Sequence, residues 1–153
     1  FAPAYQAEWL YRMGRKIGIA RATPEDRPLI DSLLSRMASE GADFTRTFRG
    51  LVTGRARDEF TDPAAFDSWA PAWQARLSRE VVPQVVLSAA NPVRIPRNHR
   101  LEEVIAAAVA GDFAPFRQLQ AALAHPFDPA PEFAAYEAAP TAGERVTRTF
   151  CGT

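Results

Sequence analysis

The sequence has 153 residues, about the length of one globular domain, and its 47% hydrophobic and 24% charged residues are typical of a packed protein. Its 18 basic and 18 acidic side chains cancel, so the chain as a whole does not attract nucleic acid or an anionic membrane. The single cysteine excludes an internal disulfide framework and a multi-cysteine zinc site. No apolar run reaches the roughly 18 residues of a membrane span, and no signal peptide is recognisable.

Residues 1–41 predict two amphipathic helices. Gly18 is the expected stop of the first helix. Thr23 is the expected N-cap of the second, before Pro24 and two first-turn acids, and Gly41 ends it. The apolar stripes of the two helices, at helical spacing, are Tyr5, Trp9, Met13 and Ile17, and then Leu29, Ile30, Leu33, Leu34 and Met37.

Residues 43–87 predict shorter helices. Asp43 is the expected cap of one helix, with the Asp43–Arg46 pair on its solvated side. Asp62 begins another, which Pro71 kinks or divides. Pro83 interrupts the strand-like composition of residues 81–87, so we expect a helix end or a buried connection there. The apolar residues of the two helices are Phe44, Phe48 and Leu51, and then Phe66, Trp69, Trp73 and Leu77.

Residues 98–124 predict a helical pair, and a proline-rich segment follows. Gly111 ends the first helix and Asp112 caps the second. The residues expected to face inward are Leu101, Val104, Ile105, Ala108 and Val109, and then Phe113, Phe116, Leu119 and Leu123. We therefore predict an all-α fold with a helical domain over 1–124, followed by a connector and tail over 125–153 that carries Cys151.

The segment NPVRIPRNHR, residues 91–100, has three interpretations. In the structural one, its prolines keep residues 91–97 extended and Asn98 caps the next helix. In the functional one, its basic side chains surround a helix N-terminus and bind a phosphate or carboxylate. In the third, His99 and Glu103 hold a metal, although two ligands do not make a site. The candidate anion-binding residues are Arg94, Arg97, His99 and Arg100.

No catalytic motif is recognisable in the chain. It has no glycine-rich phosphate loop, no zinc signature and no paired carboxylates at acid/base spacing. His125 precedes Pro126 without a serine or cysteine nucleophile arranged beside it, so it is a loop or helix-end residue rather than a general base. We therefore expect no catalytic residue, metal or cofactor in this chain.

Four stretches in order resemble the SelO (selenoprotein O, also called YdiU) family. They are PEDRPLIDSLLSRMASEGADFTRTFRGL, NPVRIPRNHRLEEVIAAAVAGDFAPFRQLQAAL, the proline-rich connector, and the terminal TFCGT. The resemblance implies the helical C-terminal part of a protein-kinase-like fold. It also implies a bacterial cytoplasmic parent, a pseudokinase that transfers AMP from ATP to protein hydroxyls with magnesium.

The family residues that contact ATP and metal precede the region matched here, so none is carried over. The resemblance instead implies a non-catalytic portion that supports and regulates the parent. It also places Cys151 at the family's redox position. Because the chain begins with Phe1 rather than methionine, we expect a processed product or an excised piece. Its expected partners are the kinase-like region and, through the parent, protein substrates, and the isolated chain is expected to self-associate.

A second hypothesis is a free-standing helical module. It would bind an anionic partner or nucleic acid through Arg94, Arg97 and Arg100. The two hypotheses differ in salt dependence, because a polyanion site loses affinity steeply as ionic strength rises.

Overall fold

The computed structural model describes residues 2–146. These residues form helices and turns without a β-strand in the described range, which confirms the predicted all-α class. The contacts divide the chain into two compact units, residues 1–92 and 93–153, which are described separately. The predicted division after residue 124 does not coincide with this one, because the connector belongs to the same unit as the preceding helical pair.

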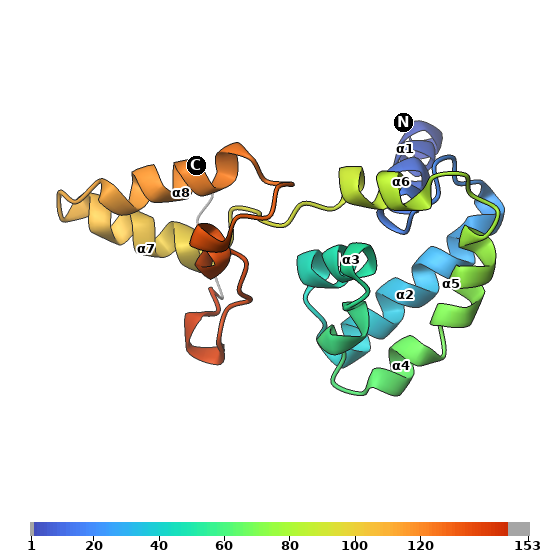
Figure 1. The fold of residues 1–153 in the computed structure, drawn as a ribbon. Coiled ribbons are helices and arrows are strands. Elements are labelled where there is room, and N and C mark those ends of the chain that lie inside the picture. Colours follow the sequence, from blue (N-terminus) through green and yellow to red (C-terminus); the bar gives the residue numbers. More distant parts are fainter. Residues whose placement is uncertain (1, 147–153) are drawn as a thin grey trace. The chain divides into compact units, whose positions relative to one another are not determined.

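Unit 1 is a set of helices (Figure 1). Helix α6 packs against both α1 and α3, whereas α4 packs against α2. The 3₁₀ turns η1 and η2 precede α2 and follow α3. The bounds are α1 Ala2–Lys16, η1 Pro24–Asp26, α2 Arg27–Glu40, α3 Phe44–Thr53, η2 Ala56–Glu59, α4 Pro63–Asp67, α5 Ala70–Leu77 and α6 Pro83–Ala90.

The predicted helix boundaries of unit 1 are largely confirmed. Thr23 caps η1, the turn that leads into α2, and Gly41 ends α2 with φ 67°. The carboxylate of Asp43 accepts the main-chain N–H of Arg46 at 2.9 Å, and that of Asp62 accepts the N–H of Ala64 at 2.9 Å. The segment with Pro71 is divided into α4 and α5.

One local prediction in unit 1 is wrong. Residues 83–90 form helix α6, because Pro83 occupies the first turn, where a helix needs no N–H donor. Val81, just before it, is 94% exposed rather than buried. The guanidinium of Arg46 also pairs with Glu59, with N–O distances of 2.7 and 2.9 Å. The hydrogen bond to Glu59, followed by the charges of Glu59 and Asp43, raises the pKa of Arg46.

The core of unit 1 combines an aliphatic centre with a row of aromatic rings. The rings of Phe66, Trp69 and Trp73 pack in a row. The centroids are 5.7 Å apart for Phe66 and Trp69 and 5.3 Å apart for Trp69 and Trp73. Each indole N–H donates to a main-chain oxygen, Trp69 to Leu29 at 2.9 Å and Trp73 to Ile17 at 2.8 Å. The predicted aromatic face is therefore confirmed. The most deeply buried apolar residues are Ile17, Ile19, Ile30, Leu33 and Phe48.

The C-terminal ends of α1 and α6 are joined by a reciprocal set of hydrogen bonds. Asn91 is fully buried, and its amide nitrogen donates to the main-chain oxygen of Lys16 at 2.9 Å. In return, Nζ of Lys16 donates to the main-chain oxygen of Ala90 at 3.3 Å and to Oδ1 of Asn91 at 3.4 Å. Arg49 of α3 donates to the main-chain oxygen of Asn91 at 3.3 Å. Helix-end carbonyls without an intrahelical partner are thereby satisfied.

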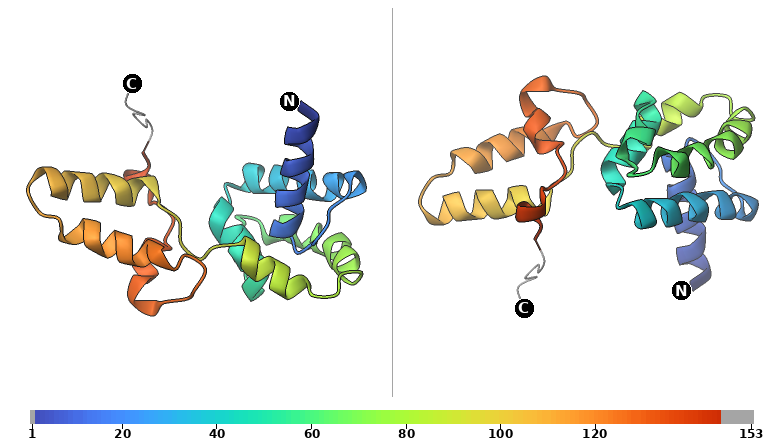
Figure 2. Two further views of the ribbon diagram at one scale, coloured as in Figure 1. Left: turned by 90° about the horizontal axis from the view of Figure 1, so that it is seen from above. Right: turned by 90° about the horizontal axis from the view of Figure 1, so that it is seen from below.

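Unit 2 consists of a helical hairpin followed by a folded connector. Figure 2 shows α7 and α8 side by side in both views, joined by a short turn. Gly111 in that turn has φ 88°, and the carboxylate of Asp112 accepts the N–H of Ala114 at 2.8 Å, as predicted. The bounds are α7 Asn98–Val109, α8 Ala114–Ala124, η3 Pro131–Tyr136 and η4 Ala142–Glu144.

The apolar stripes of the hairpin are only partly buried. Val104 and Leu119 face inward as predicted. Four other residues that were predicted to face inward are at least half exposed, which corrects that expectation: Ile105, Val109, Phe113 and Phe116. Two helices alone bury only the faces that they turn toward each other, so the remaining apolar positions stay in contact with solvent.

Asp26 and Arg76 form a largely buried ion pair that joins η1 to α5. Nε of Arg76 lies 2.6 Å from Oδ1 of Asp26, and Nη1 lies 2.8 Å from Oε1 of Glu80. Burial by itself would raise the pKa of the Asp26 carboxyl, but hydrogen bonds from Arg76 and Thr23 outweigh it, so the pKa is lowered.

We expect Asp26→Asn to lower the free energy of unfolding at pH 7 by about 2 kcal/mol, because it leaves the charge of Arg76 with a weaker partner. The lowered pKa of Asp26 means that its contribution is complete above the ordinary pKa of about 3.9 and is lost as pH falls through the folded value. The difference from wild type should therefore shrink below about pH 4. Urea unfolding at several pH values measures it.

Asp31→Asn is the matched control, because the Arg27–Asp31 pair is half exposed and spans one helical turn. Such a pair contributes about 0.3–0.5 kcal/mol. Equal losses in the two variants, or a loss in Asp26→Asn that does not depend on pH, would contradict this assignment.

Candidate functional site

The segment that carries the candidate anion-binding residues begins in an extended conformation, as predicted. Asn91 has φ −122° and ψ 99°, which agrees with the restriction that Pro92 imposes. The main-chain N–H groups of Val93 and Arg94 both donate to the oxygen of Pro126, at 2.7 and 3.2 Å. The segment therefore lies against the residues that follow α8, some thirty positions later in the chain.

The side chain of Arg94 is the centre of this arrangement. It is 1% exposed, and its Nε donates to the main-chain oxygen of Ala122 at 2.9 Å. Nη2 donates to the main-chain oxygens of His125 and Asp128, at 2.9 and 2.8 Å. Nη1 donates to the carboxylate of Glu137 at 3.1 Å. Four of the five guanidinium N–H donors are directed at partners inside unit 2.

The partners of Arg94 explain how the connector is held. Ala122 is in the last turn of α8, where main-chain oxygens lack an intrahelical donor. The guanidinium also lies over the ring of Phe133 in η3, 5.6 Å from the ring centroid. One buried cation thus fixes the end of α8, the turn after it and η3. Arg94 therefore has a structural role in unit 2, because its guanidinium donates to internal acceptors rather than to an external anion.

The other three candidates lie at the start of α7. Arg97 occupies the N-cap position and Asn98 is the first helical residue, so the predicted cap is displaced by one residue. Arg97 is buried, whereas Asn98 is exposed. His99 is 5% exposed, and its Nε2 has no hydrogen-bond partner among the described contacts. The N-terminal turn of α7 is therefore mainly an interior feature of unit 2.

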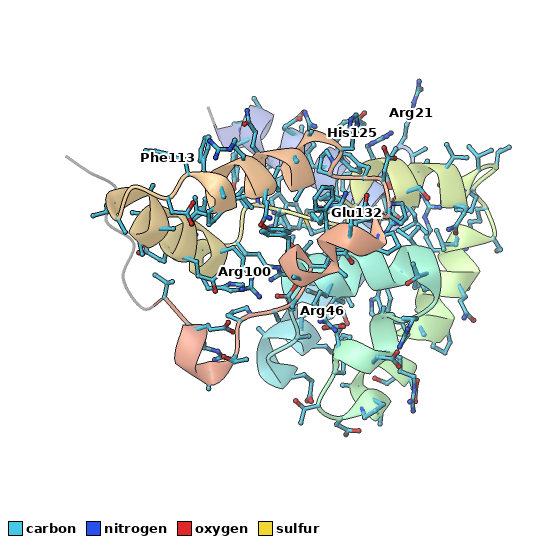
Figure 3. All side chains as sticks on the ribbon, turned by 60° about the vertical axis from the view of Figure 1, so that its left-hand side comes forward. Arg21, Arg46, Arg100, Phe113, His125 and Glu132 are labelled. Atoms are coloured by element: carbon cyan, nitrogen blue, oxygen red, sulfur yellow. The ribbon has the colours of Figure 1, made fainter. Side chains whose placement is uncertain are left out.

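Arg100 is committed to an acidic neighbour. Its Nη1 lies 2.8 and 2.9 Å from the two carboxylate oxygens of Glu103, which raises the pKa of Arg100. Hydrogen bonds from Thr141, followed by the charges of Arg100 and His99, lower the pKa of the Glu144 carboxyl. Figure 3 shows Arg100 near the start of α7, with Phe113 toward the other end of the hairpin. The carboxylates of Glu103 and Glu144 therefore already balance the positive charge of Arg100.

The metal interpretation finds no support in the geometry. Both carboxylate oxygens of Glu103 accept hydrogen bonds from Arg100 rather than facing a metal site with His99. Within residues 2–146, no three histidine, cysteine, aspartate or glutamate side chains gather at metal-binding distance. His125 is exposed at the end of α8, 3.9 Å from Asp128 (Figure 3). The redox candidate, Cys151, lies outside the described residues, so its role stays a prediction.

Curated relatives match nearly the whole chain. The protein nucleotidyltransferase YdiU of Ruegeria pomeroyi is 52% identical over 145 residues, which cover 95% of this chain and 31% of the relative. That of Roseobacter denitrificans is 53% identical over 148 residues, covering 97% and 31%. That of Rhodopseudomonas palustris is 42% identical over 166 aligned residues, covering 100% and 34%. The chain belongs to the YdiU family.

The matches confirm the family resemblance of the sequence. The chain spans about a third of the length of the curated YdiU proteins that it matches. No family model matches it. In residues 2–146, no helix is long and apolar enough to cross a membrane.

We expect Arg94→Lys to loosen the connector, because an ammonium group cannot reach the four partners of a planar guanidinium. The loss should be about 3 kcal/mol in local stability, which is about a hundredfold faster hydrogen exchange. The reporters are the amide protons of Val93, Asp128 and Glu137, each of which is bonded within unit 2.

Arg117→Lys is the control, because Arg117 is exposed on α8. It should leave the same amide protons unchanged. Slow exchange that persists in Arg94→Lys would show that Arg94 does not hold the connector.

Proposed function

We propose that this chain is a non-catalytic helical portion of a YdiU protein that transfers AMP from ATP to hydroxyl groups of other proteins. The observation that carries the proposal is the sequence match. It covers nearly the whole chain and about a third of the length of each relative named protein nucleotidyltransferase YdiU. The resemblance to SelO motifs supports a position for this portion at the C-terminal end of a kinase-like fold. Its role is structural support and regulation.

The residues present do not fit ATP or magnesium. Nucleotidyl transfer needs cations and metal positioned around the phosphates. The described part of the chain offers no cluster of carboxylates for magnesium, and the sequence has no glycine-rich phosphate loop. Arg94 is directed at internal carbonyls, and Arg100 at Glu103. We therefore assign the chemistry to the part of the parent that lies outside this chain.

An apolar surface at the tip of the hairpin supports a docking role. We call it the hairpin tip, and it consists of Ile105, Val109, Phe113 and Phe116, which are 50–85% exposed. Between residues 104 and 116 the only charged side chain is that of Asp112. Burying such an apolar surface against another protein surface lowers the free energy, whereas a charged ligand would find almost no charged group to bind there. We propose that the kinase-like region of the parent covers the hairpin tip.

Cys151 supplies the proposed regulatory function. The chain has no second cysteine, so a disulfide at Cys151 requires a thiol elsewhere in the parent or in another molecule. Forming it would tether the tail and restrain activity, and reduction would release it. Mass spectrometry of the full-length parent without reductant tests this. Activity should respond to reductant in wild type and lose that response in Cys151→Ser.

The isolated chain should transfer no AMP. Incubation with labelled ATP, magnesium and a protein acceptor should leave the acceptor unlabelled, whereas the full-length parent should label it. Because the chain lacks residues that hold the phosphates, label transferred by the chain alone would refute the assignment. A parent that is inactive under the same conditions would refute the proposed reaction instead.

The isolated chain should also self-associate through the hairpin tip, because exposed apolar patches are covered when chains meet. We expect Val109→Ser to weaken association in sedimentation at micromolar concentrations, by about tenfold in the dissociation constant if about 1.4 kcal/mol of apolar contact is lost. Val81→Ser is the control, because Val81 is equally apolar and exposed but belongs to unit 1. A monomeric wild type, or equal effects of the two substitutions, would contradict the docking role.

A further inference from the structure

The first half of helix α1 extends beyond the other helices of unit 1. Residues 3–8 are all exposed, whereas the second half of α1 packs into the core through Met13. Figure 2 shows this end of α1 projecting past α2 in both views. Two helical turns are not stable in water by themselves. This half of α1 therefore offers surface that the rest of unit 1 does not cover.

A cavity of about 100 Å³ lies beside this half of α1. It is lined by Tyr5, Gln6 and Trp9 of α1 and by Arg27, the first residue of α2. Trp9 is partly buried and packs against the core of unit 1, which fixes its ring. The guanidinium of Arg27 lies over that ring, 5.2 Å from the ring centroid. The cavity therefore combines a fixed aromatic wall with one cation.

The polar groups of the cavity have unused hydrogen-bonding capacity. Nε of Arg27 lies 3.3 Å from Oδ2 of Asp31, and within residues 2–146 neither Nη1 nor Nη2 has a partner. The amide of Gln6 and the hydroxyl of Tyr5 also have no partner in that range. A guanidinium that stacks on an aromatic ring keeps its N–H edge free for a planar acceptor such as a carboxylate.

The size of the cavity excludes a large ligand. Sites for cofactors and drug-sized molecules measure about 300–1,000 Å³. A space of about 100 Å³ holds one side chain at most and leaves the rest of the ligand outside. A peptide that inserts a single side chain fits this description, whereas a nucleotide does not.

The charge of the site favours a carboxylate over a phosphate. One cation lines the cavity, and Asp31 beside it opposes a second negative charge. A glutamate side chain carries one negative charge and two methylene groups that can lie against the rings of Tyr5 and Trp9. Residues 9–24 contain four basic side chains and no acidic one, which favours the approach of an acidic peptide.

We infer that this cavity is a docking site for a glutamate side chain in an acidic segment of another protein. The hairpin tip is apolar and almost uncharged, as permanent interfaces are. The cavity instead presents a half-exposed guanidinium with free donors, and interfaces that form and break are polar in this way. The partner is therefore a separate, transiently bound protein rather than the fixed remainder of the parent.

A peptide titration tests the proposal. The probe is a capped peptide of sequence EAEAE, and QAQAQ is its uncharged counterpart. Each is added to the chain and to the full-length parent while NMR follows the indole N–H resonance of Trp9, which Trp9→Phe identifies by its loss. EAEAE should shift this resonance at about millimolar concentration. The resonances of Trp69 and Trp73, whose indole N–H groups are bonded inside unit 1, should not shift.

Three substitutions separate the site from general electrostatics. Arg27→Gln should weaken binding of EAEAE about tenfold, because it removes the charged donors. Asp31→Asn should strengthen binding about twofold, because it removes a competing carboxylate. Arg79→Gln is the matched control, since Arg79 is exposed in unit 1 and its loss changes the net charge equally. It should change binding by less than about twofold.

Several outcomes would overturn the proposal. They are equal binding of EAEAE and QAQAQ, equal effects of Arg27→Gln and Arg79→Gln, and a Trp9 resonance that does not shift. Inorganic phosphate that displaces EAEAE at equal concentration would assign the site to phosphate instead of carboxylate. Binding to the chain but not to the full-length parent would show that the parent covers the cavity and would exclude a separate partner.

Discussion

Both units depend on side-chain donors that reach main-chain oxygens where helices end. An α-helix leaves its last carbonyls without partners, and short helices leave many of them for their length. In unit 1, Lys16 and Asn91 exchange such bonds between α1 and α6. In unit 2, Arg94 serves the last turn of α8 and the turn that follows. Elements too short to be stable alone are thereby joined into compact units.

The two units reach compactness in different ways. Unit 1 has an aliphatic centre and a row of aromatic rings, so apolar burial supplies its stability. In unit 2 the buried apolar side chains of the described residues are few, and a polar hub takes a larger part. A hub of this kind fixes one arrangement because its buried donors must all find acceptors. The apolar positions that unit 2 leaves exposed are the ones that we propose another part of a YdiU protein covers.

Sequence reasoning succeeded where the determining interaction is local. Asp43, Asp62 and Gly111 act on neighbours within a few residues, so their turn chemistry is visible in the sequence. It failed for Arg94, whose partners lie 28 to 43 positions away and are mostly main-chain oxygens, which any residue carries. Only the carboxylate of Glu137 and the ring of Phe133 offered a side-chain signal, and nothing in their spacing linked them to Arg94. The sequence therefore left the structural and the anion-binding interpretations of the basic segment open, and it did not predict the buried contacts that Arg94 makes.

The residue that follows Asn91 affects the chemical stability of unit 1. Asparagine deamidates mainly when the main-chain nitrogen of the following residue attacks its side-chain amide, and that nitrogen must carry a hydrogen. Pro92 supplies none. The buried amide that donates to α1 and to the oxygen of Leu87 is therefore protected from this slow chemistry by its neighbour. The only other asparagine of the sequence, Asn98, is exposed and precedes a histidine, which has a main-chain N–H. Deamidation should therefore occur first at Asn98.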